Sequence, residues 1–289
     1  MDLERYLMLY EYDKSMPLNP EVSKVSETNN YTLFKVYYDS VNSQRVPAVF
    51  TVPKVNNLPY PCIVFLHGYG GKKEDMLPVA DVFSKRGYST FSIDAPLHGE
   101  RRVPGKVLFS PELEEFKANI IQTIVDLRRA IDFLETRPEV SKNNIGYAGG
   151  SMGGILGALF VSIEPRIKAA AIVVGGGNLS LLIKESRHPS ILPIRAKLKK
   201  CGINYEQLSK ILAPVDPISF IHLVAPRPIQ FHCGKYDDIV PAETQRQLAE
   251  RAGEPKEVYW YEAGHGLPLN LVLERILAFF DKHLKTSKT

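Results

Sequence analysis

The chain has 289 residues, a length that suits one large α/β domain or two small ones and excludes a short, disulfide-stapled scaffold. Hydrophobic residues make up 44% and charged residues 24%, which is typical of globular domains and excludes disorder, collagen and coiled coil. Lys and Arg number 36 against 32 Asp and Glu, a net charge of +4 without any basic run, so nucleic acid is not an expected partner.

The first seventeen residues carry Asp2, Glu4 and Arg5 where a secretory signal would have a basic end followed by an unbroken apolar stretch. We therefore expect a cytoplasmic location. Nowhere does the sequence contain the run of about 18 apolar residues that a membrane-spanning helix needs. The sequence thus predicts a soluble protein without a membrane span.

Two β-rich stretches open the fold, YTLFKVYY (31–38) and VPAVFTVP (46–53), and the polar turn between them predicts a hairpin or meander at a sheet edge. After them, apolar runs alternate with stretches of helical periodicity. The further predicted strands are 62–68, 88–94, 144–150, 166–174, 227–234 and 256–264, and the predicted helices include 74–87 and about 111–137. This alternation predicts an α/β fold with a doubly wound, mostly parallel sheet and helices on both faces.

A long insertion interrupts the alternation. About fifty residues separate the strand that ends near Val174 from the strand that begins near Arg227, where a crossover needs only one helix. Residues 178–213 contain three short amphipathic stretches rich in Leu and Ile. We interpret 178–213 as a helical lid insertion whose Leu182 and Leu192 face a pocket. The alternative is a decorative insertion or a dimer contact.

The sequence Gly149, Gly150, Ser151, Met152, Gly153 lies between a predicted strand and a predicted helix. A serine exposed on a tight strand-to-helix turn needs small neighbours, because the backbone is strained and the approaching helix leaves no room for side chains. Ser151 is therefore the candidate nucleophile. The alternative is a glycine-rich turn that only ends a strand, and the position of the motif at this junction disfavours it.

A serine nucleophile needs a base that takes its proton and an acid that orients the base. Of the seven histidines, His265 follows a predicted strand and stands between two glycines, which would leave its ring accessible. The stretch GKYDDIVP follows the predicted strand 227–234 and places Asp237 or Asp238 at a carboxyl end of the sheet, where function concentrates. The candidate residues follow the chain order serine, aspartate, histidine.

Four motifs together resemble those of the α/β-hydrolase superfamily. The motifs are HGYGG (67–71), GGSMGG (149–154), GKYDDIVP (234–241) and AGHG (263–266). Within it the chain is most similar to the dienelactone-hydrolase and prolyl-oligopeptidase-like esterases. The resemblance implies a single α/β-hydrolase domain over 1–289, with 178–213 inserted into it. Dienelactone hydrolases carry cysteine where this chain has Ser151, so their substrate is not carried over.

The resemblance also assigns individual roles. The family pattern Gly-x-x-Asp-x-x-Val-Pro favours Asp237 as the acid, and Asp238 is then a solvated neighbour. The tetrahedral intermediate of acyl transfer needs two backbone N–H donors, the oxyanion hole. Met152, directly after the nucleophile, is expected to supply one donor, and Tyr69 occupies the family's position for the other. The alternative is that the HGYGG segment (67–71) is only a turn at a strand end and supplies no donor. We interpret His67 as a residue that shapes this loop.

These residues predict a serine hydrolase that cleaves carboxylic esters of small to medium, uncharged acyl groups through an acyl-enzyme intermediate. Ser151 attacks, His265 shuttles the proton and Asp237 holds His265. No P-loop, dinucleotide fingerprint or metal-spaced cluster is recognised, so neither a cofactor nor a metal is expected. A small-molecule ester is the expected partner, and a homo-oligomer is left open.

Three other functions are weighed against this one. A thioesterase or acyltransferase would use the same triad, and the sequence does not separate it from an esterase. A peptidase of the prolyl-oligopeptidase type would carry a large propeller, for which 289 residues leave no room. A catalytically silent binding module would lack a member of the triad, and none is missing here.

Overall fold

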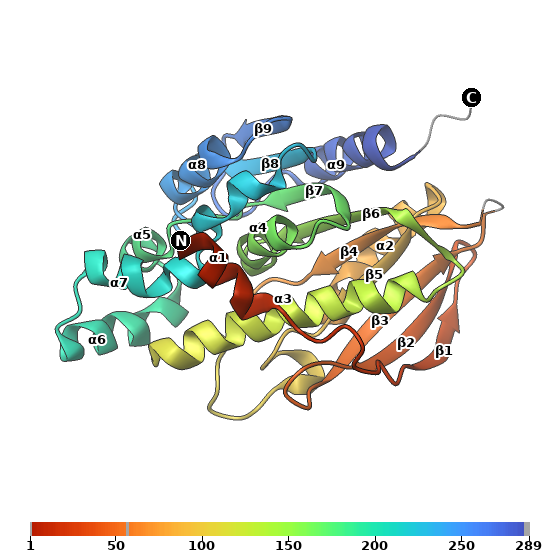
Figure 1. The fold of residues 1–289 in the computed structure, drawn as a ribbon. Helices are drawn as coiled ribbons and strands as arrows, with labels where there is room; N and C mark the ends of the chain where they lie inside the picture. The colour runs from red at the N-terminus through yellow and green to blue at the C-terminus, as the bar shows by residue number, and fades with distance from the viewer. Residues whose placement is uncertain (1, 56–57, 286–289) are drawn as a thin grey trace.

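The computed structural model describes residues 2–55 and 58–285 of the chain. The nine strands in the described residues form one sheet in the order β1-β2-β3-β5-β4-β6-β7-β8-β9 (Figure 1). Strands β4 to β9 run parallel, whereas β1, β2 and β3 run antiparallel to their neighbours. The predicted doubly wound, mostly parallel sheet is therefore confirmed. The strands are β1 (Glu21–Glu27), β2 (Tyr31–Asp39), β3 (Arg45–Pro53), β4 (Tyr60–Leu66), β5 (Ser89–Ile93), β6 (Val140–Gly150), β7 (Ile167–Val173), β8 (Ile229–Gly234) and β9 (Lys256–Tyr261).

The predicted hairpin is formed by β2 and β3, but its expected position at the sheet edge is wrong. Strand β1 pairs with the outer side of β2 and is itself the edge strand. All seven residues of β1, EVSKVSE, are exposed. The strand therefore lacks the buried apolar alternation by which a sequence reveals a strand, and pairing of its backbone with β2 holds it in the sheet.

Helices cover both faces of the sheet (Figure 1). On one face α2 and α9 contribute to one apolar core, and on the other face α3, α4 and α8 contribute to a second. Helix α3 begins and ends two residues inside the predicted range 111–137. The helices are α1 (Asp2–Leu7), α2 (Leu77–Lys85), α3 (Leu113–Glu135), α4 (Met152–Ile163), α5 (Leu179–Glu185), α6 (Leu192–Cys201), α7 (Tyr205–Leu212), α8 (Ala242–Arg251) and α9 (Leu269–Leu284).

Helix α4 lies in very close contact with the sheet. A β-carbon at Gly153 would stand 2.1 Å from the carbonyl oxygen of Leu66 in β4, and one at Gly157 would stand 2.1 Å from the ring of Tyr147 in β6. Side chains cannot approach backbone or ring atoms so closely, so only glycine allows this packing. The glycines after Ser151 therefore bring the first turn of α4 next to the end of β4.

We expect Gly153→Ala to destabilise the protein by about 1 to 3 kcal/mol, because the added methyl group collides with backbone that cannot rotate away. Gly150→Ala is the matched control. Its β-carbon would meet its nearest neighbour, the carbonyl oxygen of Val173, at an ordinary 3.8 Å. Urea unfolding of both variants measures the difference. Equal stability of the two variants would contradict this account of the packing.

The insertion between β7 and β8 contains helices α5, α6 and α7, at the positions of the three predicted amphipathic stretches. Their apolar sides belong to the same core as α3 and α4, and the buried residues concerned are Leu182, Ile183, Ile194, Leu198, Leu208 and Leu212. Because these side chains join the main core, the segment is attached firmly to the domain. Within residues 2–55 and 58–285, no helix combines the length and the apolar character that crossing a bilayer requires.

Candidate active site

Ser151 lies on the turn between β6 and α4, with φ of 57° and ψ of −120°. A positive φ is strained for any residue with a β-carbon and persists only where surrounding contacts enforce it. Two hydrogen bonds do so here: the Ser151 N–H donates to the Val173 carbonyl at 3.0 Å, and the Tyr147 hydroxyl donates to the Gly153 carbonyl at 2.6 Å. The turn holds the serine side chain at the carboxyl ends of the parallel strands, as the sequence predicts.

His265 lies in the loop after β9 and joins two of the other candidate residues. Its Nε2 is 2.9 Å from Oγ of Ser151, and its Nδ1 is 2.8 Å from Oδ2 of Asp237. An ionised carboxylate can only accept, so Nδ1 carries the proton and Nε2 is left as an acceptor for the serine hydroxyl. The imidazole is thus held in the tautomer that a general base needs.

Asp237 is buried, with 4% of its surface exposed. Its Oδ1 accepts the backbone N–H groups of Ile239 and Val240, both at 2.9 Å. Its Oδ2 accepts from His265 and from the side-chain amide of Gln245, the latter at 2.9 Å. Four donors therefore fix both carboxylate oxygens, which compensates the carboxylate for its removal from water.

Asp238 points away from this network. Its side chain is 56% exposed, and the charged group near it is the guanidinium of Arg187 at 3.6 Å. Exposed pairs at such distances contribute little to stability. Of the two neighbouring aspartates, the structure therefore brings only Asp237 into contact with His265.

Gln245 is a member of the site that the sequence analysis missed. It is fully buried in α8, donates to Asp237 and to the Val240 carbonyl, and accepts the Gly234 N–H at 3.2 Å. A signal was present, because Gln245 shares one helix face with the apolar Leu248 and Ala249 at positions i+3 and i+4. A polar residue on the buried face of an amphipathic helix indicates a specific partner.

The two residues predicted to supply oxyanion donors, Met152 and Tyr69, line the same cavity as Ser151. Met152 is the first residue of α4, where a backbone N–H has no acceptor within the helix. Tyr69 lies in the loop after β4, and its ring stacks on Phe109 at 5.7 Å between centroids. Among the described residues, neither N–H donates to a protein acceptor. Both groups are therefore available to a ligand.

The catalytic cavity, of about 300 Å³, is the one lined by Ser151, His265, Tyr69 and Met152. The inserted segment contributes Leu182, Ser186, His188, Ser190 and Ile191 to its wall, whereas the core of the fold contributes Gly68, Tyr69, Phe109, Ser151, Met152, Ile155, Ile239, Val240 and His265. The expectation for Leu192 is wrong, since its side chain is 60% exposed and lies outside the cavity. At the start of α6 the chain turns Ile191 inward and Leu192 toward solvent.

Two further histidines lie close to the catalytic cavity. The Ala95 N–H donates to Nε2 of His67, whose Nδ1 therefore carries the proton and donates to the Gly68 carbonyl. Both nitrogens of His67 bind backbone, as expected for a residue that shapes the loop. Burial lowers the pKa of His67, and burial together with the nearby His265 lowers the pKa of His188. Both effects favour the neutral form of the ring.

The fold and these contacts define the class of protein. The sheet has nine strands and is mostly parallel, and the serine lies on a strand-to-helix turn. An aspartate and a histidine follow in sequence at the ends of later strands and contact each other and the serine. This is the arrangement of an α/β hydrolase. The chain belongs to the acetyl xylan esterase family, since the model of that family, Acetyl xylan esterase (AXE1), matches residues 8–283. The protein is accordingly a carboxylic ester hydrolase.

Individual relatives agree with this assignment. The protein YtaP of Bacillus subtilis (strain 168) is 26% identical over 260 residues, which are 82% of this chain and 81% of YtaP. The esterase YjfP of Escherichia coli (strain K12) is 22% identical over 203 residues, 68% of this chain and 76% of YjfP. Among solved structures, the acetyl xylan esterase from Paenibacillus sp. R4 shares the fold with a TM-score of 0.83, at 21% identity and with 97% of this chain and 93% of that chain covered.

Proposed function

We propose that the chain is a serine esterase in which Ser151 is the nucleophile, His265 the general base and Asp237 the residue that orients His265. The contact that carries the proposal is the continuous hydrogen-bonded chain from Ser151 Oγ through both nitrogens of His265 to Asp237 Oδ2. As Ser151 attacks the ester carbonyl, Nε2 of His265 accepts the hydroxyl proton, and Asp237 stabilises the imidazolium that forms.

The backbone N–H groups of Tyr69 and Met152 stabilise the negative charge that develops on the carbonyl oxygen in this reaction. His265 then gives its proton to the leaving alcohol, and an acyl group remains on Ser151. A water molecule attacks the acyl-enzyme while His265 takes one of its protons, and His265 then gives that proton to Ser151 Oγ as the bond to the acyl group breaks and the carboxylic acid is released. The imidazole returns to its starting tautomer, so these side chains, the two backbone N–H groups and water are enough to complete the cycle.

The substrate we propose is an ester of a short, uncharged acyl group, above all acetyl, with an alcohol that carries further hydroxyl groups. The family name and the acetyl xylan esterase from Paenibacillus sp. R4 support this choice. The catalytic cavity supports it as well, because none of its described lining residues is Arg, Lys, Asp or Glu. A charged acyl group would find no partner there and would lose its hydration.

One experiment tests the proposal directly. The purified protein is treated with a fluorophosphonate probe, which is expected to label Ser151, and is then assayed on p-nitrophenyl esters of graded chain length, acetylated xylo-oligosaccharides and acyl-CoA thioesters. We expect the highest kcat/KM for acetyl esters. Preference for acyl-CoA would favour the thioesterase or acyltransferase alternative, and a protein that neither reacts with the probe nor hydrolyses esters would be a silent binding module.

We further propose that residues 178–213 act as a lid within a single domain and that they select the acyl group. Leu182, which is 6% exposed and lines the cavity, provides the test. We expect Leu182→Ala to raise the ratio of kcat/KM for longer acyl chains to kcat/KM for acetate. The expected increase corresponds to about 1 to 3 kcal/mol. Leu192→Ala, on the exposed side of the same segment, is the matched control and should leave the preference unchanged. An equal change for all chain lengths would favour a decorative insertion.

The cytoplasmic location and a homo-oligomer remain proposals from the sequence. Cell fractionation of the native host and sedimentation of the purified protein, respectively, test them.

A further inference from the structure

The inserted segment contributes three polar side chains to the wall of the catalytic cavity. Ser186, His188 and Ser190 lie between α5 and α6 and line this cavity. Ser186 is 1% exposed, and its hydroxyl donates to the Ile239 carbonyl, so it is not available to a ligand. His188 and Ser190 are partly exposed. The loop between α5 and α6 therefore offers these two side chains to a molecule in the cavity.

Hydrogen bonds fix the tautomer of His188. The Ser190 N–H donates to Nδ1 of His188 at 3.2 Å, and the Ser190 Oγ lies 2.7 Å from the same nitrogen. A backbone N–H can only donate, so Nδ1 is an acceptor and the proton of the neutral ring is on Nε2. Among the described residues, no protein group hydrogen-bonds to Nε2. Nε2 lies at the far end of the imidazole from the main chain, where its N–H is free to donate to a ligand.

The chain before His188 is tied to the loop that carries the triad aspartate. The Ser186 hydroxyl donates to the Ile239 carbonyl at 2.6 Å, and the Arg187 N–H donates to the Asp238 carbonyl at 2.7 Å. Both carbonyls belong to the loop that follows β8. Together with the bonds to Nδ1, these contacts hold the ring of His188 in place relative to the triad before a ligand binds. A donor held in this way loses little conformational freedom on binding.

His188 is close to the place from which the alcohol leaves. In the proposed reaction Nε2 of His265 gives its proton to the alcohol oxygen, so the alcohol lies beside His265. His188 lines the same cavity, and burial, followed by the nearby charge of His265, lowers the pKa of His188. The ring of His188 also lies at 79° to the ring of Tyr69, with 5.4 Å between centroids. His188 therefore borders the space that the leaving alcohol occupies.

We propose that His188 selects the alcohol part of the ester, and that its Nε2–H donates to a hydroxyl oxygen on the second or third carbon of the alcohol. The inference rests on the proposed esterase function and names a residue that recognises the hydroxylated alcohol. Leu182, in the same inserted segment, is the corresponding residue for the acyl group. The segment then contacts both halves of the substrate.

The chemistry of the site favours an uncharged oxygen as the acceptor. A neutral imidazole N–H bonds to a hydroxyl oxygen without any charge to balance. None of the described lining residues is Lys or Arg, so an anionic group would lose its hydration without gaining a counter-ion. An alkyl alcohol would cover the N–H and leave it without an acceptor, which costs free energy. A site with such a donor therefore discriminates against the alkyl analogue.

The test compares acetate esters that differ in a single hydroxyl group. The monoacetate of ethane-1,2-diol is paired with propyl acetate, and the monoacetate of propane-1,3-diol is paired with butyl acetate, because a hydroxyl and a methyl group are similar in size. We expect the wild-type protein to show a kcat/KM about tenfold higher for the hydroxylated member of at least one pair, which is roughly the effect of one hydrogen bond in a closed site. Titration of the released acetic acid at constant pH measures hydrolysis of all four esters.

Three variants test the role of His188. His188→Phe keeps an aromatic ring but has no N–H, so the ratio of kcat/KM within the preferred pair should fall from about tenfold to about one. His188→Gln supplies a side-chain N–H and should restore part of the preference. His222→Phe is the matched control, since His222 is exposed and does not line the cavity, and it should keep the wild-type ratio. A merely structural role of His188 would lower kcat/KM for both members equally and leave the ratio unchanged.

The possible outcomes separate this inference from the proposed esterase function. If the wild-type protein hydrolyses none of the four esters, the esterase function is wrong and the role of His188 with it. Equal kcat/KM within both pairs, or a preference that His188→Phe retains, would overturn the role of His188 and leave the esterase function standing. Absence of any recovery in His188→Gln, or loss of the preference in His222→Phe as well, would also overturn it, because the N–H of His188 would then not set the preference.

Discussion

Ser151→Ala is expected to lower kcat for hydrolysis of p-nitrophenyl acetate by several thousand-fold or more. The variant keeps the cavity and both oxyanion donors but has no atom that can form the acyl-enzyme. Loss of one triad member commonly removes almost all of the rate that the triad supplies, and the residual rate comes from the oxyanion hole and from binding. Retention of more than about a tenth of the wild-type kcat would rule out Ser151 as the nucleophile.

Stability measurements separate this loss from unfolding. Alanine retains the β-carbon and therefore the strain of the positive φ, so Ser151→Ala should unfold at nearly the same urea concentration as the wild type. Ser151→Gly is the informative companion variant. Glycine adopts this backbone conformation without strain, so its folded state should gain about 1 kcal/mol from relief of strain, offset in part by greater freedom of the unfolded chain. Both variants should be equally inactive.

The sequence predicted the layout of the site because the chemistry there limits the choice of residues. A strained strand-to-helix turn needs glycines on both sides of Ser151, and Gly153 in contact with Leu66 shows why. Carboxyl ends of parallel strands meet at one sheet edge, so residues more than a hundred positions apart, such as Ser151 and His265, can be expected to meet. Local patterns were sufficient for these predictions.

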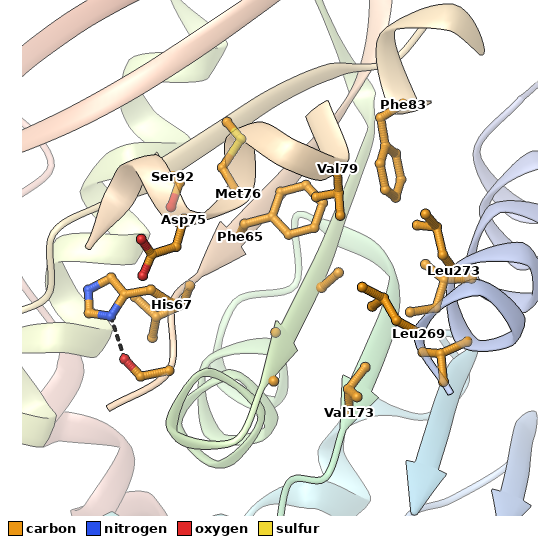
Figure 2. Close-up of a pocket in the computed structure, with 17 residues that line it drawn as sticks. Phe65, His67, Asp75, Met76, Val79, Phe83, Ser92, Val173, Leu269 and Leu273 are labelled. Carbon is orange, nitrogen blue, oxygen red and sulfur yellow. Dashed lines mark hydrogen bonds between the residues drawn. The ribbon is translucent and has the colours of Figure 1, made fainter. Parts of the chain in front are cut away.

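Other features depend on packing that no local pattern encodes. Strand β1 is held by pairing alone and has no buried face. Leu192 carries the same side chain as Leu182, but Leu182 lies on the buried side of α5, whereas Leu192 begins α6 on its exposed side. A cavity of about 280 Å³ is lined by α2, α9 and the small residues Ala148 and Gly150 of β6, which are far apart in the sequence (Figure 2). Amphipathic periodicity predicts which face of a helix is buried, but it does not predict how completely that face is covered.

The second large effect is expected for Asp237→Asn, which should lower kcat/KM by about ten-thousand-fold. The carbonyl oxygen of asparagine can replace Oδ1 and accept the N–H groups of Ile239 and Val240. Its amide nitrogen then takes the place of Oδ2 and faces two donors, His265 and Gln245. His265 can relieve this conflict by moving its proton to Nε2, where it no longer accepts the proton of the serine.

Asp238→Asn is the matched control, since it removes the same charge one residue away. The Asp238 side chain is 56% exposed, and its ion pair with Arg187, at 3.6 Å, is exposed as well. Loss of the Asp238 charge should therefore change kcat/KM less than about twofold. Steady-state kinetics of both variants with p-nitrophenyl acetate provide the comparison. Because the two variants have the same net charge, a difference between them reports contact with His265 rather than the general field of the protein. If Asp238→Asn were the inactive variant, the acid would be Asp238, and the orientation of the loop after β8 would have to be different from the one described.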